Sequence, residues 1–141
     1  LLGERCHSSA GSRYARNRLS VLDFNPTATL VVEDNLRDYF FGHRRSDFPM
    51  RWVHMRTFDL TLLLALTVKY QLHPLSVEDV IDQSSSRVDR YGAHYFAAIE
   101  MVSLCSPTNG AQPVMVRGRH VSIFCAGPPN LDTVITIAQP D

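Results

Sequence analysis

Three acidic side chains lie close together near the middle of the chain, at Glu78, Asp79 and Asp82. Their spacings of three and four residues would bring the carboxylates to neighbouring positions one turn apart on a helix. Mg²⁺ is a hard cation that takes oxygen ligands, keeps several of its waters and needs only one or two carboxylates. Such a cluster could therefore hold a hard cation such as Mg²⁺ weakly. The residues alone favour the other interpretation, an acidic helix face that only contacts solvent.

The histidines indicate structural roles rather than a metal centre. His73 precedes Pro74 at a predicted corner between two helices, and His94 stands at a predicted strand start. We expect both to be hydrogen-bonded structural residues, because imidazole binds transition metals and does not suit Mg²⁺. The remaining histidines form no i,i+4 or His-x-His pair, so a zinc site is not predicted.

The motifs of common enzymes are missing from the sequence. It has no GxxxxGK[ST] or GxGxxG loop for phosphates, and the serines at residues 84–86 lack a GxSxG nucleophile motif. The three cysteines, Cys6, Cys105 and Cys125, form no CxxC pair. We expect Cys105 and Cys125 to be buried thiols in strands, without a context that activates them. The chain is therefore not predicted to be an enzyme.

The composition is that of one globular domain. The chain has 141 residues, of which 45% are hydrophobic and 20% are charged. Lys and Arg together number 14, as do Asp and Glu, so the formal net charge is zero and a nucleic-acid partner is not predicted. The most apolar stretch, residues 60–68, falls far short of the roughly 20 residues that span a bilayer. We expect this piece to be soluble, with any membrane part outside it.

Hydrophobic periodicity predicts strands and helices in alternating groups. The expected strands cover residues 19–24, 29–33, 51–55, 95–105, 113–116, 121–125 and 134–137. The expected helices cover residues 36–41, 60–70 and 76–81. Asp59 is expected to cap the second helix, and Ser76 to be the cap or a first-turn residue of the third. This order predicts an α/β sandwich around a mixed sheet, preceded by a flexible basic lead-in at residues 1–18.

A longer pattern of motifs runs through residues 51–101. It contains Trp52, Leu72-His73-Pro74-Leu75, Glu78-Asp79, Arg87-Val88-Asp89, Tyr91 and His94-Tyr95-Phe96, in that order. Together these motifs resemble the N-terminal cytosolic domain of CorA-type magnesium transporters, and residues 121–124 and 134–137 fit two strands that follow in that family. Two features depart from the family pattern. Serines occupy residues 84–86 where a proline usually stands, and the Gly-Met-Asn motif and two transmembrane helices are absent.

The resemblance implies a fold and a parent protein. Residues 19–141 would form an αβα sandwich around a mixed, largely antiparallel sheet, like the CorA soluble domain. The parent would be an integral membrane protein, a homopentamer whose C-terminal helices cross the membrane and whose N-terminal domain faces the cytosol or an organelle matrix. Mg²⁺ would be the regulatory and transported ion, with Co²⁺ and Ni²⁺ as further substrates. Mg²⁺ between neighbouring cytosolic domains would hold the pore closed.

The resemblance also gives Asp79 a role. This residue aligns with the family position that supplies a carboxylate to the inter-subunit magnesium, while the partner carboxylate comes from a later helix of a neighbouring subunit. Asp79 is thus expected to form half of a regulatory site. Glu78 and Asp82 would be outer-shell groups that reach the ion through water. We expect the isolated chain to be largely monomeric.

Three other interpretations stay open at this point. The parent could transport zinc or another divalent cation within the same family, because the cytosolic fold would look the same. The chain could instead be a soluble α/β interaction module without a membrane part. A hydrolase that uses Asp or Glu as an acid or base has little support. Two apolar spans of about 20 residues downstream would separate the transporters from the other two.

Overall fold

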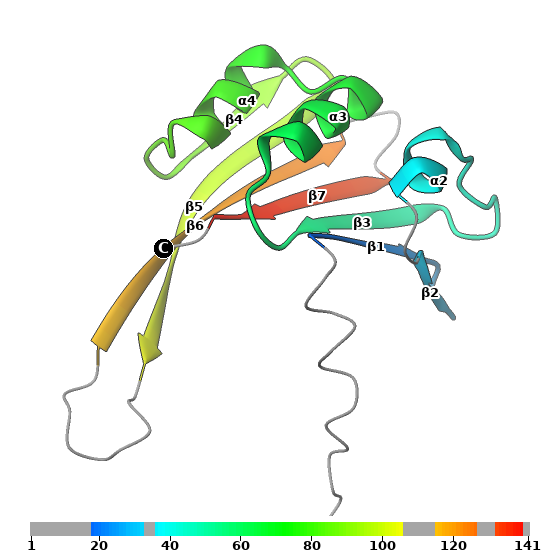
Figure 1. The fold of residues 1–141 in the computed structure, drawn as a ribbon, viewed down its shortest axis with the longest axis horizontal. Helices are drawn as coiled ribbons and strands as arrows, with labels where there is room; N and C mark the ends of the chain where they lie inside the picture. Colours follow the sequence, from blue (N-terminus) through cyan, green and yellow to red (C-terminus); the bar gives the residue numbers. More distant parts are fainter. Residues whose placement is uncertain (1–17, 33–35, 106–114, 127–131, 140–141) are drawn as a thin grey trace, which may run out of the picture.

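The computed structural model describes residues 18–32, 36–105, 115–126 and 132–139, which form one mixed sheet with helices packed on it (Figure 1). Its strands are β1 Leu19–Phe24, β2 Thr29–Val32, β3 Met50–Met55, β4 Arg87–Tyr91, β5 His94–Cys105, β6 Met115–Ala126 and β7 Thr133–Ala138. Its helices are α2 Leu36–Phe41, α3 Leu60–Tyr70 and α4 Pro74–Ile81. The seven strands lie in the order β2-β1-β3-β7-β6-β5-β4, and only β3 and β7 pair in parallel. The predicted mixed α/β fold with a largely antiparallel sheet is therefore confirmed.

Side chains of the central strands alternate between the core and the opposite face of the sheet. On β3, Val53 and Met55 are fully buried, whereas Trp52 between them is 40% exposed. Successive residues of a strand point to opposite faces, so one face of the sheet carries the core. Helices α3 and α4 lie over that face (Figure 1), and Leu63 and Leu66 of α3 are fully buried there.

Helix α3 begins and ends where local signals in the sequence place it. The Asp59 side chain accepts hydrogen bonds from the backbone N–H groups of Thr61 and Leu62, which would otherwise lack partners in the first turn. Gln71 ends the helix in the left-handed conformation, with a φ of 52°. The predicted helix over residues 60–70 and its Asp59 cap are confirmed.

Helix α4 begins two residues earlier than the predicted start at residue 76, and Ser76 is not its cap. Pro74 occupies the first turn, where its missing N–H costs nothing and its fixed φ suits a helix. His73 is the cap, because its ring Nδ1 accepts a hydrogen bond from the Leu75 N–H at 3.2 Å. Ser76 is a buried first-turn residue whose hydroxyl donates to the His73 carbonyl at 2.7 Å.

The sheet corrects two further predictions from the sequence. The strands expected at residues 113–116 and 121–125 are one strand, β6, because Gly118 stays in the ladder opposite Val102 of β5. A strand was not expected at β4, yet this charged segment pairs with β5 at the sheet edge. Strands β5 and β6 continue as a two-stranded arm beyond the rest of the sheet (Figure 1).

Several predictions lie outside the described residues. They are the lead-in up to residue 17, Cys6, and the turns at residues 106–110 and 127–130. The side chain of Cys105 is also outside the description, although its backbone belongs to β5. Cys125 is a partly buried free thiol, and burial raises its pKa, which disfavours the reactive thiolate.

Candidate functional site

The Asp79 carboxylate is held between α4 and the edge strand β4. The Arg87 guanidinium forms an ion pair with its Oδ2 atom. The Tyr91 hydroxyl donates to Oδ2 at 3.2 Å, and the Ser84 hydroxyl donates to Oδ1 at 3.1 Å. The Asp79 side chain is only 12% exposed. Among the three predicted acids, Asp79 is therefore fixed in one orientation by three neighbouring side chains.

Glu78 and Asp82 lie in a different environment from Asp79. Both are exposed, and Asp82 ends α4, where its backbone N–H donates to the Glu78 carbonyl at 2.9 Å. Within the part of the chain that the structure describes, no group of three or more His, Cys, Asp or Glu side chains is placed to hold a metal ion. The three acids do not form a closed cation cage in a single chain.

Arg87 joins two carboxylates at this site. Besides Asp79 it contacts Asp89 on its own strand, with its Nε atom 3.0 Å from the Asp89 Oδ2. The hydrogen bond with Asp79 raises the pKa of Arg87, so the guanidinium remains charged. Two carboxylates share one guanidinium, which leaves the trio with a net negative charge. A divalent cation that approaches Asp79 would compete with Arg87 or bind through a water molecule.

His73 connects the start of α4 to the same carboxylate. Its ring stacks on that of Tyr91, with centroids 4.9 Å apart and planes inclined by 15°, and the Tyr91 hydroxyl donates to Asp79. Because Nδ1 of His73 accepts from a backbone N–H, the ring proton is on Nε2. The predicted structural role of this corner histidine is confirmed.

His94 stands at the start of β5, as predicted, and contacts the same corner. Its Nε2 atom accepts from the His73 backbone N–H at 3.4 Å, which places its ring proton on Nδ1. Burial, with a smaller contribution from His73, lowers the pKa of His94. In each ring, the one nitrogen that carries a lone pair already accepts a hydrogen bond from a backbone N–H. This disfavours metal binding by His73 and His94.

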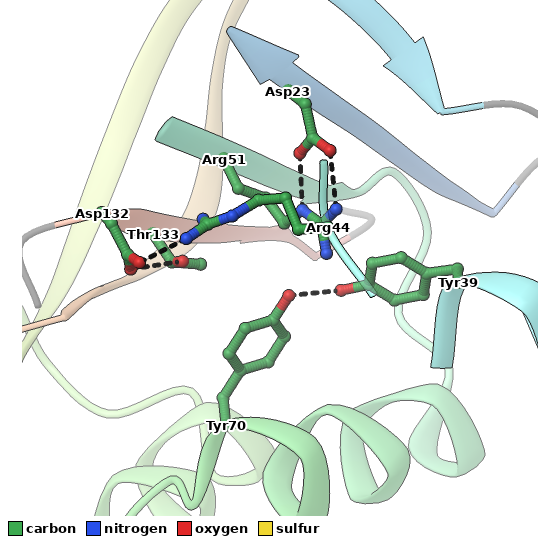
Figure 2. Close-up of polar contacts among 7 residues, drawn as sticks. All are labelled: Asp23, Tyr39, Arg44, Arg51, Tyr70, Asp132 and Thr133. Carbon is green, nitrogen blue, oxygen red and sulfur yellow. Dashed lines mark hydrogen bonds and ion pairs between the residues drawn. The ribbon is translucent and has the colours of Figure 1, made fainter. Parts of the chain in front are cut away.

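A buried polar cluster lies on the helix-covered face of the sheet (Figure 2), and sequence reasoning did not indicate it. Asp23 of β1 and Arg51 of β3 are cross-strand partners, and two hydrogen bonds of 2.6 and 2.7 Å join their side chains. The hydroxyls of Tyr39 and Tyr70 lie 2.8 Å apart beside them. Burial raises the pKa of Tyr39 far above its usual range, so this phenol stays protonated. The cluster is internally satisfied and joins α2 and α3 to the sheet.

The Asp23 and Arg51 pair does have a signal in the sequence, although a weak one. Both residues occupy positions of their strands that face the helices, and each is two residues from a buried valine, Val21 for Asp23 and Val53 for Arg51. Opposite charges at inward positions of two strands indicate a buried pair only when the register is known. That register comes from the structure.

Comparison with known proteins gives a likeness in fold. No protein-family model matches the chain, and no curated protein matches it. The fold is similar to that in the complete structure of the CorA magnesium transporter from Methanocaldococcus jannaschii, with a TM-score of 0.54 and 12% identity. The match covers 87% of this chain and 32% of that chain. None of the described helices is long and apolar enough to cross a membrane. The chain therefore has a fold like that of about one third of a CorA magnesium transporter.

Proposed function

We propose that this chain is the magnesium-sensing and gating domain of a CorA-like divalent cation transporter. The observation that carries the proposal is the match in fold, in which 87% of this chain corresponds to about one third of a magnesium transporter. The other two thirds of that transporter lie outside the match. In this proposal the parent is a membrane-bound homopentamer, and the domain faces the cytosol or an organelle matrix. Mg²⁺ is the regulatory and the transported ion.

Asp79 is the proposed contribution of this domain to a regulatory site between subunits. Its carboxylate is oriented by Arg87, Ser84 and Tyr91, which supports such a role because an oriented ligand loses little freedom when it binds. Mg²⁺ keeps most of its water shell, so one carboxylate from each subunit is enough. The second carboxylate is proposed to come from a neighbouring subunit.

In this half site, the Arg87 guanidinium competes with Mg²⁺ for the Asp79 carboxylate. The guanidinium already neutralises Asp79 in the single chain, so bound Mg²⁺ has to replace it or share the carboxylate with it. This competition weakens the affinity for Mg²⁺. Weak affinity suits a sensor of an ion that is abundant in cells. The exposed acids Glu78 and Asp82 are proposed to contact the hydrated ion through its waters.

The test uses the full-length parent in membranes and measures how Mg²⁺ protects the soluble domain from a protease. Asp79→Asn should lose the Mg²⁺-dependent protection, because the neutral amide is a poor ligand for Mg²⁺. The amide keeps the shape and one acceptor for Tyr91, so the fold should be retained. Glu78→Gln is the matched control, since it makes the same change at an exposed neighbour. Equal protection of Asp79→Asn and the wild type would contradict the proposed site.

A further inference from the structure

A cavity of about 560 Å³ lies where the α3–α4 corner meets the end of the sheet. Its wall combines five parts of the chain: the end of α3, the start of α4, the turn between β4 and β5, the end of β6 and the start of β7. Tyr70, Asp132 and Thr133, which Figure 2 draws, belong to this wall. The volume is within the roughly 300–1,000 Å³ of small-molecule sites.

Part of the wall is apolar and buried. Leu72, Phe124 and Ile135 lie behind its surface and are 6%, 2% and 2% exposed, whereas Tyr70, Pro74 and Tyr91 are less buried and offer carbon surface that a ligand can reach. Apolar surface of this kind favours a ligand with an apolar body, because burying that body removes it from water. Hydrogen-bonding groups on the rest of the wall then determine which polar group the ligand carries.

The two histidines of the corner present donors rather than acceptors. Nδ1 of His73 and Nε2 of His94 each accept from a backbone N–H, and both residues line the cavity. Their protons are therefore on His73 Nε2 and His94 Nδ1, where each ring can donate to a ligand. A ligand with acceptor oxygens fits these two N–H groups.

The charged side chains of the wall are one cation, Lys69, and one carboxylate, Asp132. Lys69 lines the cavity, and its ammonium contacts the Phe40 carbonyl at 3.1 Å and the Tyr39 ring at 5.3 Å. None of the ion pairs among the described residues involves Lys69. The one carboxylate of the wall, Asp132, is already paired with Arg44 and accepts from the Thr133 hydroxyl. Lys69 thus adds a charge that no acid of the wall neutralises.

We propose that this cavity binds a small organic anion with an apolar body, held by Lys69, His73 and His94. A carboxylate on an aromatic or aliphatic group is the simplest ligand of this class, since a carboxylate oxygen accepts from an ammonium or from an imidazole N–H. Burial, together with the neighbouring Arg51, lowers the pKa of Lys69, and a bound anion would offset that effect. The site does not depend on the proposed transport function.

The test titrates the full ¹⁵N-labelled chain with benzoate and, separately, with benzamidinium, which has the same ring and the opposite charge. Benzoate should shift the amide signals of Leu72, Gly92 and Ala93 saturably, with roughly millimolar affinity for so small a ligand. Benzamidinium should not. Equal responses to both ions, no saturable response to benzoate, or shifts centred on Trp52 on the other face of the sheet would overturn the proposal.

Charge variants provide a second readout. Lys69→Gln should weaken benzoate binding by roughly tenfold or more, the loss expected for one charged hydrogen bond. Arg119→Gln removes the same charge from an exposed position on β6 and should leave the affinity unchanged. Identical affinities of the Lys69 variant and the wild type would overturn the assignment of the anion to this wall. If Lys69→Gln does not fold, the comparison of the two ions in the wild type still decides.

Discussion

The Arg87 guanidinium lies against the Asp79 carboxylate and ties edge strand β4 to helix α4. These residues are separated by a short connection in the sequence, yet they come from different types of element. The carboxylate is 12% exposed and the guanidinium 39%. The pair therefore orients a nearly buried acid while leaving its partner accessible to solvent and to competing cations.

The first prediction concerns Arg87→Gln in the full-length parent. Removal of the guanidinium takes away the cation that competes for Asp79, so Mg²⁺-dependent protease protection should reach its midpoint at a lower Mg²⁺ concentration. Arg90→Gln on the same strand is the control, because the described contacts of Arg90 are with the Gly92 carbonyl and the Tyr95 ring. An unchanged midpoint in Arg87→Gln would show that the guanidinium does not compete with the ion.

The second prediction concerns the histidine cap of α4. His73→Ala should lower the free energy of unfolding by about 1 kcal/mol, the usual cost of losing an N-cap. His73→Asn should recover most of this loss, because the Asn side chain accepts from the same first-turn N–H groups. Urea unfolding measures both. If the Asn variant were as unstable as the Ala variant, the main contribution of His73 would be its stacking on Tyr91 rather than the cap.

The third prediction concerns pH. Burial lowers the pKa of His94 and of His54 in the folded chain, while the unfolded value is about 6.5. At a pH between the lowered folded pKa and about 6.5, the unfolded chain binds more protons at these histidines than the folded chain does. The free energy of unfolding is therefore highest above about pH 6.5 and decreases as the pH falls below it. Urea unfolding between about pH 5 and 8 should show this slope, and His94→Gln should reduce it. A slope identical in wild type and His94→Gln would contradict the prediction.

The fourth prediction concerns the buried pair of Asp23 and Arg51. Asp23→Asn should cost about 3–5 kcal/mol of unfolding free energy, because it leaves the Arg51 charge buried without a partner. The double variant Asp23→Leu with Arg51→Met should be markedly more stable than Asp23→Asn, since it removes both charges. The exposed pair of Arg45 and Asp47 is the control, and Asp47→Asn should change stability little. A denaturant series on all variants measures the comparison, and a double variant less stable than Asp23→Asn would contradict it.

The sequence predicts elements whose signals are local. The helix from residue 60 to 70 has a capping Asp59 and an apolar face, and it forms as expected. Strand β4 was missed because its sequence, RVDRY, is mostly charged, which an edge strand tolerates and a sequence pattern does not reveal. Helix α4 starts before the expected residue 76 because Pro74 is accommodated in its first turn, and because histidine is an uncommon cap that the sequence does not mark.

The candidate site was predicted in part. The acid at position 79 stands out by its spacing from its neighbours and by the family resemblance, but its partner Arg87 does not. That pairing depends on how α4 packs beside β4, a tertiary contact that neither periodicity nor composition encodes. The same holds for the cavity wall, where Lys69, His94 and Asp132 meet from elements far apart in the sequence. The metal role of Asp79 remains a prediction.

The position of β7 has a consequence for how the chain folds. This strand is the last in the described sequence, yet it lies between β3 and β6 and is the strand that joins β2-β1-β3 to β6-β5-β4. Its pairing with β3 brings together residues as far apart as Arg51 and Thr133, and contacts so distant along the chain form slowly. Without β7 these two parts of the sheet share no strand pairing, so we expect them to join only after residues 133–138 have been synthesised.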